Sequence, residues 1–259
     1  MITFNDADIN ALLGMFFYPL ARILALLSAA PPFNNASLPT QTRLILGLSI
    51  TVAIAPIAAE TLPVIPLASG AGLMVLAEQM LIGYGMGFSM RLVFGALDMA
   101  GHTFSTQMGL GFATSYDPTN SSQTAVVSEV LSILALLMFI GIDGHLMVLS
   151  TLAQSFQALP IGTLPGSASW ANLANAGAIV FSSGLLLVLP IVVTLLITNT
   201  ALGVLGRVSP QLNIMVIGFP ITITLGFATL YVCLPYMIGP LTQMFETGQR
   251  MMLENLVMR

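Results

Sequence analysis

The stretch AIVFSSGLLLVLPIVVTLLITNTALGVLG, residues 178–206, contains no charged side chain. It belongs to a longer run, from Gly144 to Gly206, that also lacks Asp, Glu, Lys and Arg. A helix that crosses a bilayer needs about 20 mainly apolar residues, and residues 178–206 exceed that length. This stretch therefore predicts a membrane-spanning helix and decides the fold class.

Five further apolar segments extend this pattern over the whole chain, at about 13–30, 44–59, 72–97, 126–153 and 214–241. Of the 259 residues, 6% are charged and 56% are hydrophobic, whereas soluble domains carry about 25% charged residues. So few charges could not cover the surface of a soluble globule. We therefore predict an all-α integral membrane protein, a single domain over residues 1–259 with about six hydrophobic helices.

Prolines and glycines punctuate these segments. The prolines inside them are Pro19, Pro56, Pro190, Pro220 and Pro235. Each removes a backbone hydrogen bond, and neighbouring protein usually supplies a replacement partner. The sequence thus favours broken helices packed against other protein. The spacing of Gly83 and Gly87 would permit close helix contact, although glycine is also common in membrane helices generally.

The C-terminal residues 241–259 predict a short amphipathic helix, because apolar side chains recur there at roughly helical spacing. It could dock on a partner or lie on a membrane surface. The few arginines do not define a topology. Arg43 and Arg207 would place two loops in the cytoplasm, but six spans would then put Arg250 and Arg259 on the opposite side.

Several function classes are disfavoured by composition. The absence of lysine excludes a Walker A loop and a Schiff-base site. The single cysteine, Cys233, excludes internal disulfides and iron–sulfur clusters. A net charge of −4 without a basic run argues against nucleic-acid binding. Asp143 and His145 are two possible metal ligands without a third. We predict no catalytic, cofactor-binding or metal-binding residues, hence a protein that is not an enzyme.

Ionisable residues inside the apolar segments are expected to face protein or water, because each costs about 2.5–3.5 kcal/mol at a helix centre in lipid. Those expected to be buried or ion-paired are Arg22, Glu78, Arg91, Asp98, His102 and Asp143. Arg91, Asp98 and His102 share one helix face. They could form an Arg91–Asp98 pair, pair with a neighbouring subunit, or serve an ion pathway in a secondary transporter. The scarcity of carboxylates favours pairing.

The loop after the third segment combines bulky apolar side chains with a glycine frame. Its candidate plug or gate residues are Met108, Leu110, Phe112 and Tyr116. Non-helical backbone at membrane depth persists only where protein or a water-filled cavity surrounds it. The loop could therefore be a hydrophobic constriction that gates a pore, or it could pack on the protein's own core.

Short motifs also follow one another in a particular order. They are Arg22, Ala30-Pro31-Pro32-Phe33, Leu38-Pro39, Arg43, the loop from Gln107 through Gly109 to Ala113, Asp117-Pro118, Asp143-Gly144-His145, Ser155-Phe156, Leu159-Pro160, and Pro210-Gln211-Leu212-Asn213. In this order and spacing the chain resembles the FliR/SctT family, the export-gate membrane proteins of bacterial flagellar and virulence type III secretion systems. The flagellar members are the closer match, with an injectisome homologue as the alternative.

The resemblance implies a non-enzymatic channel subunit, needed for flagellum assembly, in the bacterial inner membrane at the flagellar basal body. Family members assemble with FliP-type and FliQ-type subunits into a hetero-oligomeric helical channel complex. This complex works with FlhB-type and FlhA-type proteins and passes unfolded substrate chains. The loop matching Gln107–Asp117 would plug the closed channel. No cofactor is implied.

Overall fold

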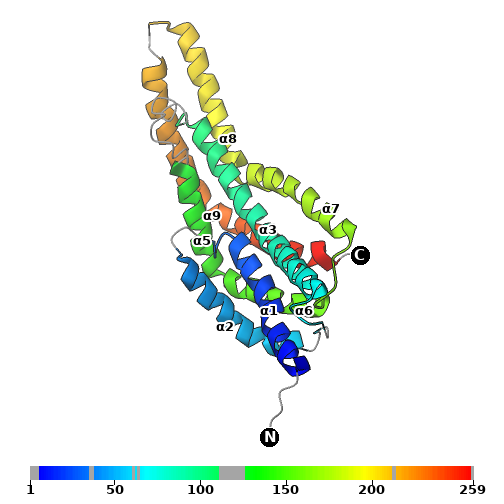
Figure 1. Cartoon of the computed structure of the whole chain (residues 1–259). Helices are drawn as coiled ribbons and strands as arrows, with labels where there is room; N and C mark the ends of the chain where they lie inside the picture. Colours follow the sequence, from blue (N-terminus) through cyan, green and yellow to red (C-terminus); the bar gives the residue numbers. More distant parts are fainter. Residues whose placement is uncertain are drawn as a thin grey trace, which may run out of the picture. The chain divides into compact units, whose positions relative to one another are not determined.

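The computed structural model describes residues 6–34, 38–59, 62, 65–110, 126–211 and 214–257. All regular elements in these ranges are helices (Figure 1). They are α1 (Asp6–Ala29), α2 (Thr40–Ala59), α3 (Gly70–Gln107), α5 (Val126–Gly141), α6 (Gly144–Ala158), α7 (Ser167–Asn175), α8 (Gly177–Val208) and α9 (Ile214–Val257).

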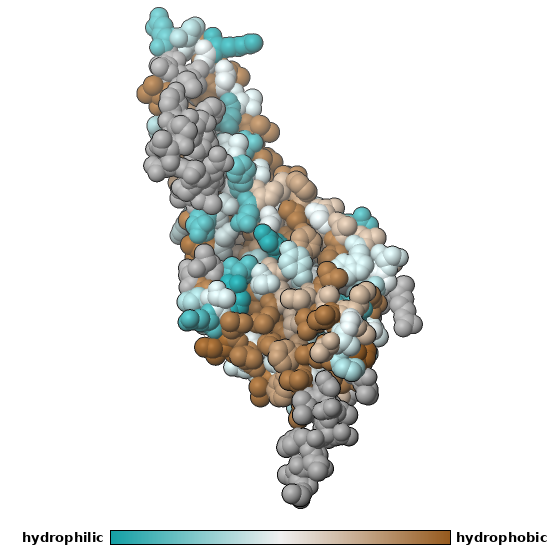
Figure 2. Space-filling model, viewed as in Figure 1, coloured by the Kyte–Doolittle hydropathy of each residue, from teal (hydrophilic) through white to brown (hydrophobic). Residues whose placement is uncertain are grey.

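Five of the helical stretches are long and apolar enough to cross a membrane, and α5 with α6 makes a sixth if that interrupted pair counts as one span. The predicted all-α class with about six hydrophobic helices is confirmed. Large apolar side chains cover much of the face seen in Figure 2. Many are strongly exposed in the single chain, for example Leu186 (69%) and Ile197 (65%). Such surfaces require lipid or partner subunits to cover them.

The helices are not broken at the prolines, contrary to the prediction from the sequence. Helices α1, α2, α8 and α9 run continuously through their prolines, since membrane helices tolerate proline where neighbours or local adjustments compensate. The interruption that the structure describes is between α5 and α6, where Asp143 adopts the left-handed conformation (φ 56°). Residues 154–175, which lie between two of the predicted apolar segments, contain the end of α6 and the short helix α7.

The described residues form two compact units. Unit 1 comprises Met1–Leu92, Asp143–Gly177 and Phe245–Arg259, and unit 2 comprises Val93–Ile142 and Ala178–Met244. Both α3 and α9 continue from one unit into the other. The single domain remains a prediction.

In unit 1, α3 lies against α1 at two glycines. A Cβ at Gly83 would collide with the carbonyl oxygen of Arg22, and one at Gly87 would lie 2.6 Å from Ala29 Cβ and 2.7 Å from Leu26 O. Neither position has room for a side chain at this crossing. The close helix contact predicted from the Gly-x-x-x-Gly spacing is therefore confirmed.

In unit 2, α3 contacts α5 and α8. Its Gly101 meets the backbone of Ser128 on α5, and Phe94 packs edge-on to Phe139 with ring centroids 6.1 Å apart. On α8, a Cβ at Gly184 would lie 2.5 Å from Ala96 O. Small residues thus let α3 approach its neighbours closely. Figure 1 shows α8 and α9 running alongside each other.

The C-terminal amphipathic helix predicted at 241–259 is not a separate element. Residues 241–257 are the last part of α9, which continues without a break past Pro240. Within unit 1 this part is two-sided, with Phe245 and Met252 buried and Glu246 and Arg250 exposed. The helical periodicity was therefore informative, whereas the predicted start was wrong.

Candidate functional site

The end of α3, where the glycine-rich loop begins, is the first candidate site. Gly109 has φ 81°, its N–H donates to Thr106 O at 3.0 Å, and the N–H of Leu110 donates to Ser105 O at 3.1 Å. This pair of bonds around a left-handed glycine is a Schellman motif, which ends a helix and satisfies its last carbonyls. Gly109 is therefore the residue that stops α3 after Gln107.

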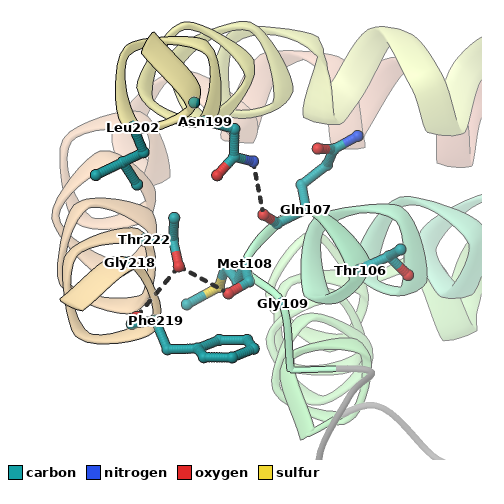
Figure 3. A pocket seen from close by; sticks show the side chains of 10 residues that line it. Thr106, Gln107, Met108, Gly109, Asn199, Leu202, Gly218, Phe219 and Thr222 are labelled. Atoms are coloured by element: carbon teal, nitrogen blue, oxygen red, sulfur yellow. Dashed lines mark hydrogen bonds between the residues drawn. The ribbon is translucent and has the colours of Figure 1, made fainter. Parts of the chain in front are cut away.

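The two remaining carbonyls at this end bind side chains from other helices of unit 2. Thr222 Oγ1 on α9 donates to Met108 O at 3.0 Å, and Asn199 Nδ2 on α8 donates to Gln107 O at 3.4 Å (Figure 3). These residues border an open pocket of about 420 Å³. The C-terminal carbonyls of a helix have no partner within it, so α8 and α9 complete the end of α3.

Side-chain packing fixes the same turn. Met108 is fully buried, and its side chain occupies the space that a Cβ on Gly226 would fill, with contacts of 2.7–2.9 Å. A Cβ on Gly109 would lie 2.7 Å from the Phe219 ring, which lies beside the turn in Figure 3. Met108, predicted as a plug residue, is here part of the packing at the loop's beginning, and Leu110 is partly buried.

The remaining loop residues predicted from the sequence, Phe112, Tyr116, Asp117 and Pro118, lie outside the described residues, as does Asn213. Pro210 and Gln211 are exposed in the connection between α8 and α9. Their assignment to a family motif and the plug assignment of the loop stay predictions.

Arg22 is the second candidate site, in unit 1. It is fully buried on α1 and binds α3 and the end of α6: Nε donates to Gln79 Oε1 at 2.8 Å, Nη1 to Ser155 O at 3.0 Å, and Nη2 to Leu159 O at 2.9 Å. The guanidinium also lies 4.3 Å from the centroid of the Phe156 ring. Its positive charge is placed at the negative C-terminal end of α6, which the helix dipole favours.

The predicted burial of Arg22 is confirmed, but in the described part of the chain its partners are neutral. The other ionisable residues predicted to be buried or ion-paired are less buried than Arg22. Arg91, Asp98, His102 and Asp143 are exposed in the single chain, and Glu78 is partly buried. The face of α3 that packs in unit 2 carries Leu97, Ala100 and Phe104 instead. Their burial or ion pairing against a partner subunit stays a prediction.

The predicted Arg91–Asp98 pair is not formed. Among the described residues the ion pair present is Arg250–Glu246, at 3.9 Å on the surface of α9. Asp98 instead accepts a hydrogen bond from Ser132 Oγ of α5 at 2.8 Å. Arg91 and Asp98 are seven positions apart on α3, about 10 Å along the axis, so the two side chains are too far apart to pair.

Sequence reasoning missed Thr222, Asn199 and Gln79, and it named Ser155 only as part of a motif, not as a partner of Arg22. Threonine and serine are frequent in membrane helices, where they often bond the preceding turn, and here Thr222 Oγ1 also lies 3.1 Å from Phe219 O. No local pattern distinguishes a threonine that reaches another helix. These partners follow only from the packing.

Together, the fold and these sites define an integral membrane protein whose interior polar groups join helices. Residues 13–248 match the family described as bacterial export proteins, family 1. The chain belongs to this family. It is 47% identical to the flagellar biosynthetic protein FliR of Pectobacterium carotovorum, over 91% of this chain and 90% of the relative. It is 42% identical to that of Escherichia coli K12, over 88% and 87%, and 28% identical to that of Bacillus subtilis, over 85% of each.

Proposed function

We propose that this protein is a non-enzymatic gate subunit of the bacterial flagellar protein-export channel. The observation that carries the proposal is the family match over residues 13–248, with similarity to flagellar biosynthetic proteins over about nine-tenths of the chain. The flagellar names of these relatives favour a flagellar over an injectisome system. The protein would act in the inner membrane, at the flagellar basal body.

Its partners in this proposal are FliP-type and FliQ-type subunits in one hetero-oligomer, together with FlhB-type and FlhA-type proteins. Exposed apolar side chains support association. Tyr231 and Phe227 on α9 are 78% and 50% exposed, and Leu186 on α8 is 69% exposed. Partner helices covering these surfaces would remove apolar area from contact with water or lipid.

The plug of the closed channel is, in this proposal, the loop that starts at Leu110. Leu110, Phe112 and Tyr116 supply apolar bulk on a segment whose beginning is fixed by the Schellman turn at Gly109. A narrow apolar constriction excludes ions by dewetting. Because the first residues of the loop are held, its apolar side chains would stay at the constriction, and the loop would still move aside for a substrate chain entering the channel.

Deletion of Leu110–Tyr116 is therefore expected to raise the resting ion leak of cells several-fold while the complex still assembles. The measurement is ion-sensitive growth together with channel conductance. Assembly is verified by copurification of FliP-type and FliQ-type subunits with the tagged chain. The matched control replaces Leu164, an exposed residue of the connection between α6 and α7, with Ala.

Two outcomes would contradict the proposal. Wild-type ion tightness in a deletion variant of proven assembly would remove the plug role, and the loop would then be packing. A wild-type tagged chain that purifies alone as a stable monomer would remove the channel-subunit role.

A further inference from the structure

The carbonyls at the end of α3 are satisfied in two different ways. Those of Phe104, Ser105 and Thr106 accept from the N–H groups of Met108, Leu110 and Gly109, so the turn itself serves them. Among the described residues, the donors to the carbonyls of Gln107 and Met108 are side chains of α8 and α9. The chain thus uses two other helices of unit 2 to hold the last residues before the loop.

We propose that Thr222 and Asn199 are positioning residues that fix where the loop begins, and so set how firmly it seals the channel. The inference rests on the proposed plug function and adds the residues that control it. Thr222 is the principal one, because it is buried (6% exposed) and its bond is 3.0 Å long. Asn199 is exposed and its bond is 3.4 Å long, so its effect is smaller.

Thr222 has two acceptors for one hydroxyl hydrogen. Its Oγ1 lies 3.0 Å from Met108 O and 3.1 Å from Phe219 O in its own helix. A hydroxyl has a single hydrogen to donate, so it can bond the loop's first turn or turn back onto α9. If the hydroxyl turns back onto Phe219 O, α9 loses no hydrogen bond, whereas Met108 O loses its hydrogen bond to Thr222. The contact with the loop is therefore breakable without damage to the helix that provides it.

Steric contacts restrict the same turn. The Phe219 ring leaves no room for a side chain at Gly109, and Gly226 leaves a notch that the Met108 side chain fills. The turn therefore fits closely on α9, with Met108 O directed at Thr222 (Figure 3). Shape selects this position, and the hydroxyl stabilises it.

The test compares the resting ion leak of assembled complexes. Thr222→Val removes the hydroxyl at nearly unchanged shape and is expected to raise the leak above wild type, by up to about tenfold, the population shift that one net hydrogen bond supports. The leak should stay below that of the Leu110–Tyr116 deletion. Thr222→Ser restores the hydroxyl and should return the leak to the wild-type level.

The matched control is Thr224→Val. Thr224 is an exposed threonine two residues away, whose hydroxyl bonds Pro220 O of its own helix at 2.7 Å. The Thr224→Val variant should leave the ion leak unchanged. Asn199→Ala, at an exposed position that threatens no packing, should give a smaller rise and serves as the test if Thr222→Val fails to assemble.

Three results would overturn the inference. The first is a wild-type leak in assembled Thr222→Val, or in Asn199→Ala where Thr222→Val does not assemble. The second is an equal leak in Thr222→Val and Thr224→Val. With either of these two results, the plug function would still be supported if the loop deletion leaks. The third is a deletion that stays ion-tight, which would remove the plug and the inference with it.

Discussion

Replacement of the buried Arg22 with methionine is expected to destabilise the protein strongly. Methionine fills similar space with an unbranched, adaptable side chain, but it removes the donors that serve Gln79 Oε1 and Leu159 O. Each buried acceptor left unpaired costs about 1–3 kcal/mol. We therefore expect a loss of about 3 kcal/mol and a strongly reduced yield of assembled complex.

The measurement is the thermal stability and yield of the purified complex. Arg250→Met is the matched control. Arg250 is 71% exposed, and its ion pair with Glu246 is long, at 3.9 Å. Exposed pairs contribute little, so this variant should remain within about 0.5 kcal/mol of wild type. Arg22→Lys keeps the charge but loses the planar fork and should fall between the two. Equal stability of Arg22→Met and Arg250→Met would contradict the role assigned to Arg22.

Gly83→Ala is expected to have the second largest effect. The added methyl group would meet the backbone oxygen of Arg22, and the contact with Ala25 Cβ would be 3.0 Å. A backbone atom cannot move aside as a flexible side chain can, so α1 and α3 must separate. Overpacking of this kind costs about 1–3 kcal/mol, and we expect the upper end of that range, because the separation would also disturb the bonds of Arg22.

Gly203→Ala provides the comparison. Gly203 lies inside α8, is exposed, and has no atom within 4 Å of an added Cβ. Alanine is the better helix former by about 1 kcal/mol, so this variant should be neutral or slightly more stable. Both substitutions are compared by the melting temperature and yield of the complex. A Gly83→Ala complex as stable as Gly203→Ala would show that the α1–α3 contact is looser than these distances indicate.

The sequence allowed the spans to be predicted because lipid-facing helices impose a length and an apolar composition on each segment. The run without charges between Gly144 and Gly206 contains α6, α7 and most of α8, with the non-helical residues 159–166 between α6 and α7. It did not reveal the break at Asp143, because no local pattern indicated the left-handed backbone of that residue (φ 56°). Proline was a poor guide to breaks, because its local cost was offset by the surroundings of each helix.

For the two candidate sites, individual residues could be predicted from the sequence, but their interaction partners could not. A buried arginine at position 22 was predicted, but its acceptors lie 57, 133 and 137 residues away, and most of them are backbone carbonyls that any residue could provide. The loop was recognised from Met108–Phe112, yet Met108 belongs to the packing that precedes it. Which of many membrane threonines reaches that turn is decided by helix packing alone.

The passage of exported chains beside Leu110 is the central claim, and site-specific crosslinking tests it most directly. A photoreactive residue replaces Leu110, which is only partly buried at the start of the loop. The cells export a flagellar substrate fused to a tightly folded domain that stalls it in the channel. We expect a crosslink between position 110 and the stalled substrate, absent when the fused domain is omitted. An assembled, export-competent complex that holds the stalled substrate and gives no such crosslink would contradict the claim.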